Sequence, residues 1–244
     1  TTYLPQYPAE KDVNFGDRLN VSTFFPGYED ALKGYCGLLF RKPLLLQDTV
    51  PGPIKDFWPD LDLMGTHGDV FAQRLFFQGL HRGASYVLVD MQARPMGMES
   101  ARLDVAQAEA LNLRPYCVRY DATDLAQLPR FVVINGKKTL QQIVFKECVE
   151  VESGNFGFST VERARVWRLP VMYDETWQAH ATGPVEWEIW EIQEGNIGNA
   201  FSEETHWMPI DKGVTTLTEI PVAIFNASPD PDDDTRFRGP VLDE

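Results

Sequence analysis

The sequence predicts an α+β fold in which a helical first half precedes an antiparallel, β-rich second half. Apolar residues recur at helical spacing in the first half, short β-like segments follow in the second, and an Asn-Gly pair separates two of these segments. No stretch has the composition of a linker. We therefore expect a single α+β fragment over 1–244, with a helical part at 1–113, a β-rich part at 114–228 and an acidic C-terminal loop at 229–244.

Two long helices are predicted in the first half. An apolar stripe over 26–39 ends at the basic pair and proline of 41–43, which predicts a buried helix. A second helix follows, with Thr66 or Asp69 as its cap. It ends at Gly83, because glycine readily adopts the left-handed conformation that terminates helices.

The segments around these helices are shorter. Residues 1–14 are predicted to be extended, and 47–63 to form a loop with at most one helical turn. A strand at 85–90 directly follows the second helix, and a loop at 91–101 leads to a short helix at 104–113.

The second half is predicted to form an antiparallel meander of roughly six strands. Alternation at 116–120 indicates a strand with two different faces, and Asn135-Gly136 predicts a two-residue hairpin turn between 131–134 and 139–145. Further β-like segments lie at 143–151, 162–169, 186–192, 206–210 and 219–225.

Composition and charge exclude several classes. With 43% apolar and 24% charged residues the chain is typical of globular proteins, and no apolar run approaches the roughly 20 residues of a membrane helix. The net charge of −14 argues against a basic nucleic-acid-binding surface. Residues 1–120 carry 12 basic and 14 acidic groups, whereas 121–244 carry 10 and 22, so the acidity belongs to the second half.

The cysteines predict a reducing compartment, and the chain ends lead us to expect a longer parent protein. Cys36, Cys117 and Cys148 lie in apolar stretches without short spacing, and we interpret them as buried thiols from a reducing compartment. The chain begins without an initiator Met or a signal peptide, and it closes on Pro240 to Glu244 with no turn residue after the apolar pair, so we expect that both ends are cut from something longer.

Possible metal and phosphate sites are weak. Asp230 to Asp234 could gather oxygen ligands for Ca²⁺ or Mg²⁺, but the spacing lacks the turn glycine and distal glutamate of a calcium loop, so a solvated loop is favoured. Gly136-Lys137-Lys138 does not match a phosphate-binding loop. No zinc site is expected, because the histidines are far apart in sequence: His67, His81, His180 and His206.

The segment 186–192 combines glutamates with Trp187 and Trp190, which are the materials of a sugar-binding cleft. The same residues also fit a strand that buries indole on one face and exposes glutamate on the other, and we favour this structural interpretation. No catalytic, cofactor-binding or metal-binding residue is therefore assigned, and the protein is predicted not to be an enzyme.

The order of short motifs resembles a family of portal-like proteins of tailed bacteriophages and prophages. The matching pieces cover most of the chain and run in order as Tyr3-Leu4-Pro5, Asp17-Arg18-Leu19, Phe24-Phe25, Gly37 to Pro43, Gly65-Thr66, Phe71-Ala72, Gly83 to Asp90, Leu113 to Tyr116, Tyr120 to Asp124 and Ile220 to Phe225. The sequence departs from the pattern at Thr66-His67-Gly68-Asp69, where a small polar and an aliphatic residue usually follow the Gly-Thr pair.

The resemblance implies a structural role in the virion without a cofactor. A portal is a ring, usually of twelve subunits, at one capsid vertex; it contacts capsid protein, the packaging terminase and a head-tail adaptor, and double-stranded DNA passes through it without sequence-specific binding. It also implies that an N-terminal lead segment and everything after Glu244 are missing, so these residues would be largely the wing, with the β-rich region reaching toward the clip.

Two other functions remain open at this point. One is a carbohydrate-active enzyme or glycan-binding module that uses Trp187, Trp190 and nearby glutamates. The other is a different phage tail or adaptor protein. For a head-to-tail ring, we expect lateral contacts to favour 1–120, with the acidic region directed toward solvent or a more basic partner.

Overall fold

The computed structural model describes residues 4–22, 26–92, 104–153, 156–194 and 205–230. Its helices are α1 (Asp12–Val21), α2 (Gly27–Leu39), α3 (Gly52–Phe57), α4 (Gly68–Arg82), α5 (Val105–Ala110) and the short 3-10 helix η1 (Ala122–Asp124). Its strands are β1 (Ala84–Met91), β2 (Pro115–Asp121), β3 (Leu125–Ile134), β4 (Lys137–Ser153), β5 (Gly157–Arg168), β6 (Val171–Tyr173), β7 (Ala179–Ala181), β8 (Glu186–Glu194), β9 (Thr205–Val214) and β10 (Val222–Asn226). The predicted α+β class is confirmed.

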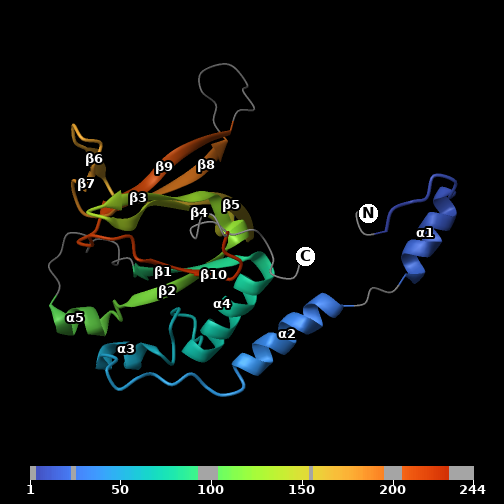
Figure 1. The fold of residues 1–244 in the computed structure, drawn as a ribbon, viewed down its shortest axis with the longest axis horizontal. Helices are drawn as coiled ribbons and strands as arrows, with labels where there is room; N and C mark the ends of the chain where they lie inside the picture. Colours follow the sequence, from blue (N-terminus) through green and yellow to red (C-terminus); the bar gives the residue numbers. More distant parts are fainter. Residues whose placement is uncertain (1–3, 23–25, 93–103, 154–155, 195–204, 231–244) are drawn as a thin grey trace.

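The main body has three layers, which can be followed in Figure 1. One face of a three-stranded sheet, with the order β10-β1-β2, packs against α4, and the other face packs against a seven-stranded sheet with the order β6-β7-β3-β4-β5-β8-β9. Strand pairing is antiparallel except for one parallel contact between β3 and β7. The hydrophobic core lies between the two sheets.

Strand β1 is covered on both faces along its first half. Alternate side chains point into the core between the sheets, namely those of Ala84, Tyr86 and Leu88. Ser85 points the other way, and its Oγ donates a 2.9 Å hydrogen bond to the carbonyl oxygen of Leu75 on α4. Burial raises the pKa of the Tyr86 hydroxyl to about 12, which keeps it neutral inside the core.

The second predicted helix, α4, is confirmed together with its glycine end. Gly83 has a φ of 89°, so it reverses the chain from α4 directly into β1. The predicted cap is wrong: the side chain of His67, and not that of Thr66 or Asp69, accepts the first hydrogen bond, from the backbone N–H of Asp69 at 3.3 Å. An imidazole nitrogen can accept this bond as an oxygen does, although oxygen-bearing residues dominate at caps.

The first predicted helix, α2, is confirmed, but it is not a buried helix. Leu32 and Cys36 are buried toward α4, whereas Leu38 on the outer stripe is 73% exposed. Because α2 has a neighbour on only one side, the remaining apolar residues at its C-terminal end stay uncovered among the described residues.

Helix α1 contradicts the extended lead-in predicted for 1–14 only at residues 12–14, because residues 4–11 are not helical. It begins at Asp12 without a side-chain cap, so the sequence carries no start signal for it. Figure 1 shows α1 apart from the layered body, and no residue of this helix is buried. Arg18 ties it to the preceding segment through a 2.6 Å ion pair with Glu10 and a hydrogen bond to the carbonyl oxygen of Pro5.

Three of the shorter predicted elements are confirmed. The helical turn within 47–63 is α3, the strand at 85–90 is β1, and the helix at 104–113 is α5, which begins with a capping box between Asp104 and Gln107. The loop predicted at 91–101 lies mostly outside the described residues.

The meander prediction needs two corrections. The segments predicted at 139–145 and 143–151 are one continuous strand, β4, and the last predicted strand at 219–225 becomes β10, which leaves the large sheet and pairs with β1. The Ile220 side chain enters the core there, so burial decides the sheet to which this segment belongs. Strands β6 and β7, of three residues each, were not predicted, because so short a segment carries no measurable alternation.

The Asn135-Gly136 hairpin is confirmed, with φ values of 52° and 76°. Ile134 pairs with Lys137 directly beside the turn. A side chain at position 136 would meet open space, so only the backbone conformation demands glycine there.

Gly136→Val should therefore destabilise the protein by about 1 kcal/mol or more, because a β-branched residue resists positive φ. Gly136→Asn is the matched control and should cost far less, because asparagine tolerates this conformation. Urea unfolding of the three proteins gives the comparison. Equal stability of the valine and asparagine variants would show that the turn does not require positive φ.

Candidate functional site

An ionic cluster joins the two sheets. Arg165 on β5 donates from Nε to Glu147 Oε1 on β4 at 2.8 Å, and its Nη1 contacts Asp90 Oδ2 on β1. The side chains of all three residues are less than 20% exposed. One guanidinium therefore connects the large sheet to the small one through two carboxylates at the edge of the apolar core.

Two tyrosines complete this cluster. Tyr120 on β2 donates its hydroxyl to Glu147 Oε1, and its ring stacks on Phe145 with centroids 3.9 Å apart. Tyr116 donates to Asp90 Oδ2 at 3.4 Å. Burial, reinforced by the Glu147 carboxylate, raises the pKa of Tyr120, so its hydroxyl stays protonated as a donor.

The charge balance of the cluster favours an ion pair over proton transfer. Burial alone would lower the pKa of Arg165, but the carboxylate of Glu147, followed by Tyr120 and Asp90, outweighs burial and raises it. The charged and hydroxyl groups of the cluster hydrogen-bond to one another. Its arrangement fits a clamp between the sheets.

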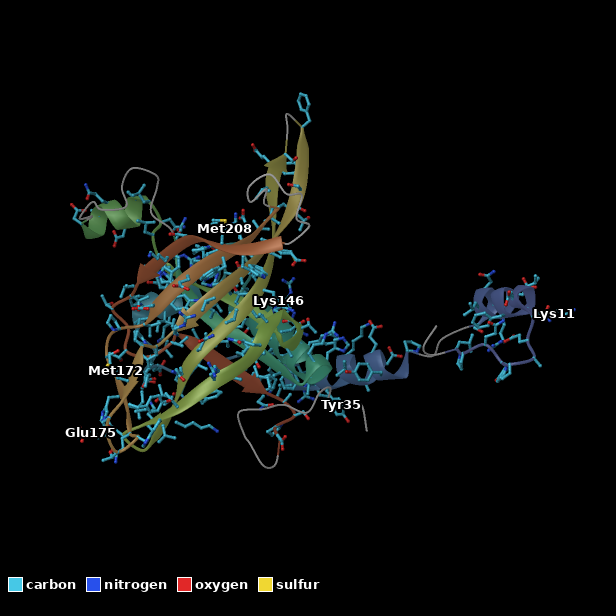
Figure 2. The ribbon with its side chains drawn as sticks, turned by 90° about the horizontal axis from the view of Figure 1, so that it is seen from above. Lys11, Tyr35, Lys146, Met172, Glu175 and Met208 are labelled. Carbon is cyan, nitrogen blue, oxygen red and sulfur yellow. The ribbon has the colours of Figure 1, made fainter. Side chains whose placement is uncertain are left out.

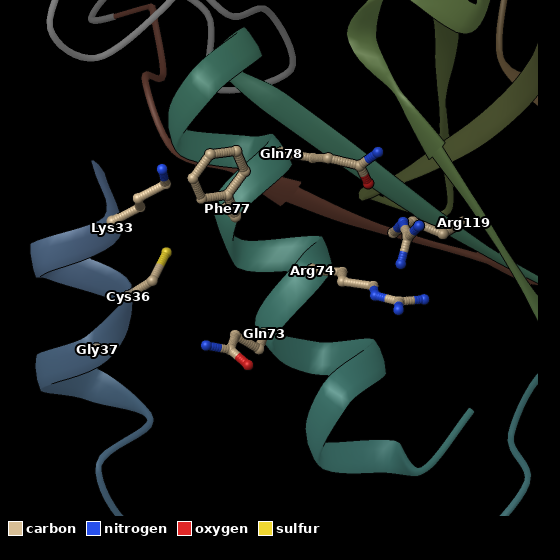
Figure 3. Close-up of a pocket in the computed structure, with 8 residues that line it drawn as sticks. All are labelled: Lys33, Cys36, Gly37, Gln73, Arg74, Phe77, Gln78 and Arg119. Carbon is tan, nitrogen blue, oxygen red and sulfur yellow. The ribbon is translucent and has the colours of Figure 1, made fainter. Parts of the chain in front are cut away.

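A second feature is a groove between α2 and α4, shown in Figure 3. It has a volume of about 530 Å³ and is lined by Lys33, Cys36, Gly37, Gln73, Arg74, Phe77, Gln78 and Arg119. We call it the α2–α4 groove. Three of these residues are cationic, on a chain whose net charge is −14.

The cations of the α2–α4 groove differ in their neighbours. Lys33 forms an exposed ion pair with Glu29 on α2, with 2.6 Å between the charged atoms. Within the described part of the chain, Arg74 and Arg119 have no acidic partner within 4 Å, and the buried Nε of Arg119 has no hydrogen-bond acceptor. Burial, followed by repulsion from Arg74, lowers the pKa of Arg119, and the more distant carboxylates of Asp62, Asp121 and Asp124 offset this only in part. The groove therefore fits a negatively charged occupant.

A third feature is a hollow of about 550 Å³ beside the Asn135-Gly136 turn. The exposed rings of Tyr173 and Trp177 lie at its rim with centroids 6.3 Å apart. Between them in sequence, Asp174 accepts hydrogen bonds from His180 and Thr176, which hold the pKa of its carboxyl far below the usual range. Asp174 therefore closes the turn between β6 and β7.

The tryptophan and glutamate strand predicted at 186–192 is β8. Trp187 lies opposite Trp167 on β5 and packs against the core. Trp190 lies opposite Ala164 and points to the other face of the sheet. The expectation that both indoles share one face is wrong, because residues three apart on a strand point in opposite directions. The two indoles do not form one stacking surface for a sugar.

The glutamates of this strand have basic neighbours on β5. Glu191 accepts a 2.8 Å hydrogen bond from Arg163, and Glu188 lies 3.9 Å from Arg168. Glu188 also accepts a hydrogen bond from the indole N–H of Trp190 at 3.0 Å. The strand therefore uses these carboxylates in cross-strand pairs.

The other candidate residues are dispersed. Among the described residues, no group of three His, Cys, Asp or Glu side chains could hold a metal ion. Of the acidic run at 230–234, only Asp230 lies within the described residues. His81 lies in the last turn of α4, as predicted, and its Nδ1 is 3.2 Å from the Tyr28 hydroxyl.

The cysteine prediction is correct only for Cys36. Cys117 is half-buried and Cys148 is exposed, and all three thiols are free. Cys148 lies on the outward face of β4 beyond the edge of the sheet, where local apolar sequence does not imply burial.

Sequence reasoning missed both the ionic cluster and the groove. A charged residue within an apolar strand, such as Arg165 between Ala164 and Val166, is a signal for a buried pair, but its partners are 18 and 75 positions away. The groove depends on the packing of α2 against α4, which no local pattern specifies.

No protein-family model matches the chain, and no curated protein matches its sequence. Within the described residues, no helix is both long and apolar enough to cross a membrane.

Arg165→Met should destabilise the protein by about 3 kcal/mol, because it leaves Asp90 and Glu147 as unpaired, largely buried carboxylates. Arg168→Met is a matched control on the same strand, since Arg168 is half-exposed and its ion pair with Glu188 spans 3.9 Å; it should cost under about 1 kcal/mol. Guanidinium unfolding at neutral pH measures both. Equal losses would mean that the cluster contributes no more than a surface pair.

Proposed function

We propose that this chain is a structural subunit of a portal-like ring in a tailed-phage virion. The observation that carries the proposal is the exposure of apolar side chains in two separate places. At one end, Val13 and Val21 on α1 and Leu38 on α2 are each more than 70% exposed; at the other, Phe156 beyond the end of β4 is fully exposed. Tyr35 and Leu39, close to Leu38 on α2, are also more than half exposed, and apolar side chains exposed together are typical of surfaces that a partner covers.

Two different exposed apolar surfaces on one chain favour head-to-tail contact between subunits. A two-fold dimer would cover one surface with its own copy and leave the other open, whereas a heterologous contact covers both and gives a ring when its rotation closes. The ordered motifs from Tyr3 to Phe225 that resemble portal-like proteins support the same architecture. Its partners would be further copies of the chain, capsid protein, the packaging terminase and a head-tail adaptor.

The electrostatics suit a passage for DNA. Acidic surface repels phosphate, and a conduit requires weak contact with the duplex that slides through it. In this proposal the chain carries no catalytic residue and no cofactor, and its work is mechanical and structural.

The chain should form a closed ring, because heterologous contacts that close give cyclic symmetry, and the resemblance to portal-like proteins implies roughly twelve copies. Native mass spectrometry over a range of concentrations should show a single large species, a multiple of the 27.7 kDa subunit mass. A chain that stays monomeric, or that stops at a dimer, would contradict the proposal.

Duplex DNA should not bind the chain measurably at physiological salt, because a net charge of −14 opposes association and leaves few cations for counterion release. A gel-shift series at increasing salt tests this. Micromolar binding that weakens steeply with salt would show a cationic DNA surface that the proposal does not contain.

A further inference from the structure

Strands β4 and β5 extend beyond the sheet to which they belong. They pair with each other as far as Ser153 and Gly157, whereas β3 accompanies β4 only to Phe145 and β8 accompanies β5 only to Arg163. The described residues 146–153 and 156–162 therefore form a two-stranded projection, which we call the β4–β5 arm. Figure 2 shows it rising from the body, with Lys146 near its base.

The tip of the β4–β5 arm is aromatic. Phe156 is 100% exposed and Phe158 is 70% exposed. A two-stranded ribbon is marginally stable in water by itself, and exposed phenyl rings at its end add an unfavourable apolar surface. An arm of this kind is stabilised when its tip is inserted into another surface.

One face of the arm is also acidic. On β4, Glu150 and Glu152 are two residues apart and therefore point to the same face. On β5, Glu162 lies opposite Cys148, which puts its carboxylate on that face as well. Phe158, opposite Glu152, shares the face with these three glutamates. In the described part of the chain, none of these three glutamates forms an ion pair. The arm therefore presents phenyl rings beside unpaired negative charge.

The α2–α4 groove has the complementary properties. It offers the ring of Phe77 and the thiol of Cys36 together with the unpaired guanidinium groups of Arg74 and Arg119. Its volume of about 530 Å³ lies in the range of pockets that hold aromatic ligands. A carboxylate beside Arg74 and Arg119 would offset the mutual repulsion of the two guanidinium groups.

The arm cannot reach the groove of its own copy. In Figure 2 the arm rises away from the side of the body on which α2, marked by Tyr35, lies. Contact between the two surfaces therefore requires two copies of the chain, with the arm of one meeting the groove of another. Such a contact is heterologous, so it can repeat around a ring.

We propose that the β4–β5 arm of each subunit inserts into the α2–α4 groove of its neighbour, with Phe156 and Phe158 in the groove and the glutamates against Arg74 and Arg119. The inference rests on the proposed ring and names the contact that holds it together. It also accounts for an acidic second half that meets its neighbour without repulsion, because the acidic face of the arm lies on the cationic groove.

Charge reversal tests this contact in the full 244-residue chain. Arg74→Glu and Glu152→Arg should each raise the concentration for half-assembly at least tenfold, because each places like charges together. The double variant restores opposite charges and should return to within about threefold of the wild type. Arg130→Glu, an exposed charge reversal on β3 outside the groove, is the control and should leave assembly unchanged.

Mass photometry measures assembly, and circular dichroism with urea unfolding checks that each variant folds, as expected for substitutions at exposed positions. If the wild type forms rings and the single variants do so equally well, the arm contact is wrong while the ring proposal stands. If only Arg74→Glu disrupts assembly, the groove holds an occupant other than the arm, which also overturns the contact. A wild type that never assembles would overturn both.

Discussion

The burial of β1 on both faces is the constraint on which the rest of the structure depends. Ser85 fixes the strand to α4, and Tyr86 and Leu88 fix it to the large sheet. A strand in this position cannot shift by one residue, because a shift would exchange its core-facing and helix-facing side chains. Its register therefore sets where α4, β2 and β10 lie.

The ionic cluster extends this constraint to the edge of the core. Asp90, near the end of β1, lies where Arg165 can bridge it to Glu147 on β4. Because a guanidinium is planar and holds its donors in a fixed arrangement, the bridge sets the orientation of the sheets as well as their separation. The β4–β5 arm begins at residue 146, one position before Glu147, so the clamp holds the base of the arm while its far end projects.

The same architecture leaves opposite charges on different surfaces. The cations of the α2–α4 groove come from two helices and from Arg119 on β2, and the carboxylates of the arm come from one hairpin. A subunit that separates these surfaces cannot neutralise them internally. In the proposed contact another copy would neutralise them, with the groove of the near-neutral first half receiving the acidic arm.

Local signals in the sequence predicted the elements better than their assembly. Gly83 and Asn135-Gly136 were read correctly because the conformations they permit are properties of single residues. Helix α1 was missed because it begins without a cap, and 219–225 was assigned to the wrong sheet because pairing depends on a distant edge of β1. The cluster and the groove join residues far apart in the chain, so no spacing rule could find them.

The symmetry of the assembled particles tests the central claim, head-to-tail assembly, most directly. Electron-microscopic class averages of the purified chain should show rings with one rotational axis, in which every subunit has the same orientation. Particles related by two-fold axes, with like surfaces facing one another, would contradict the account.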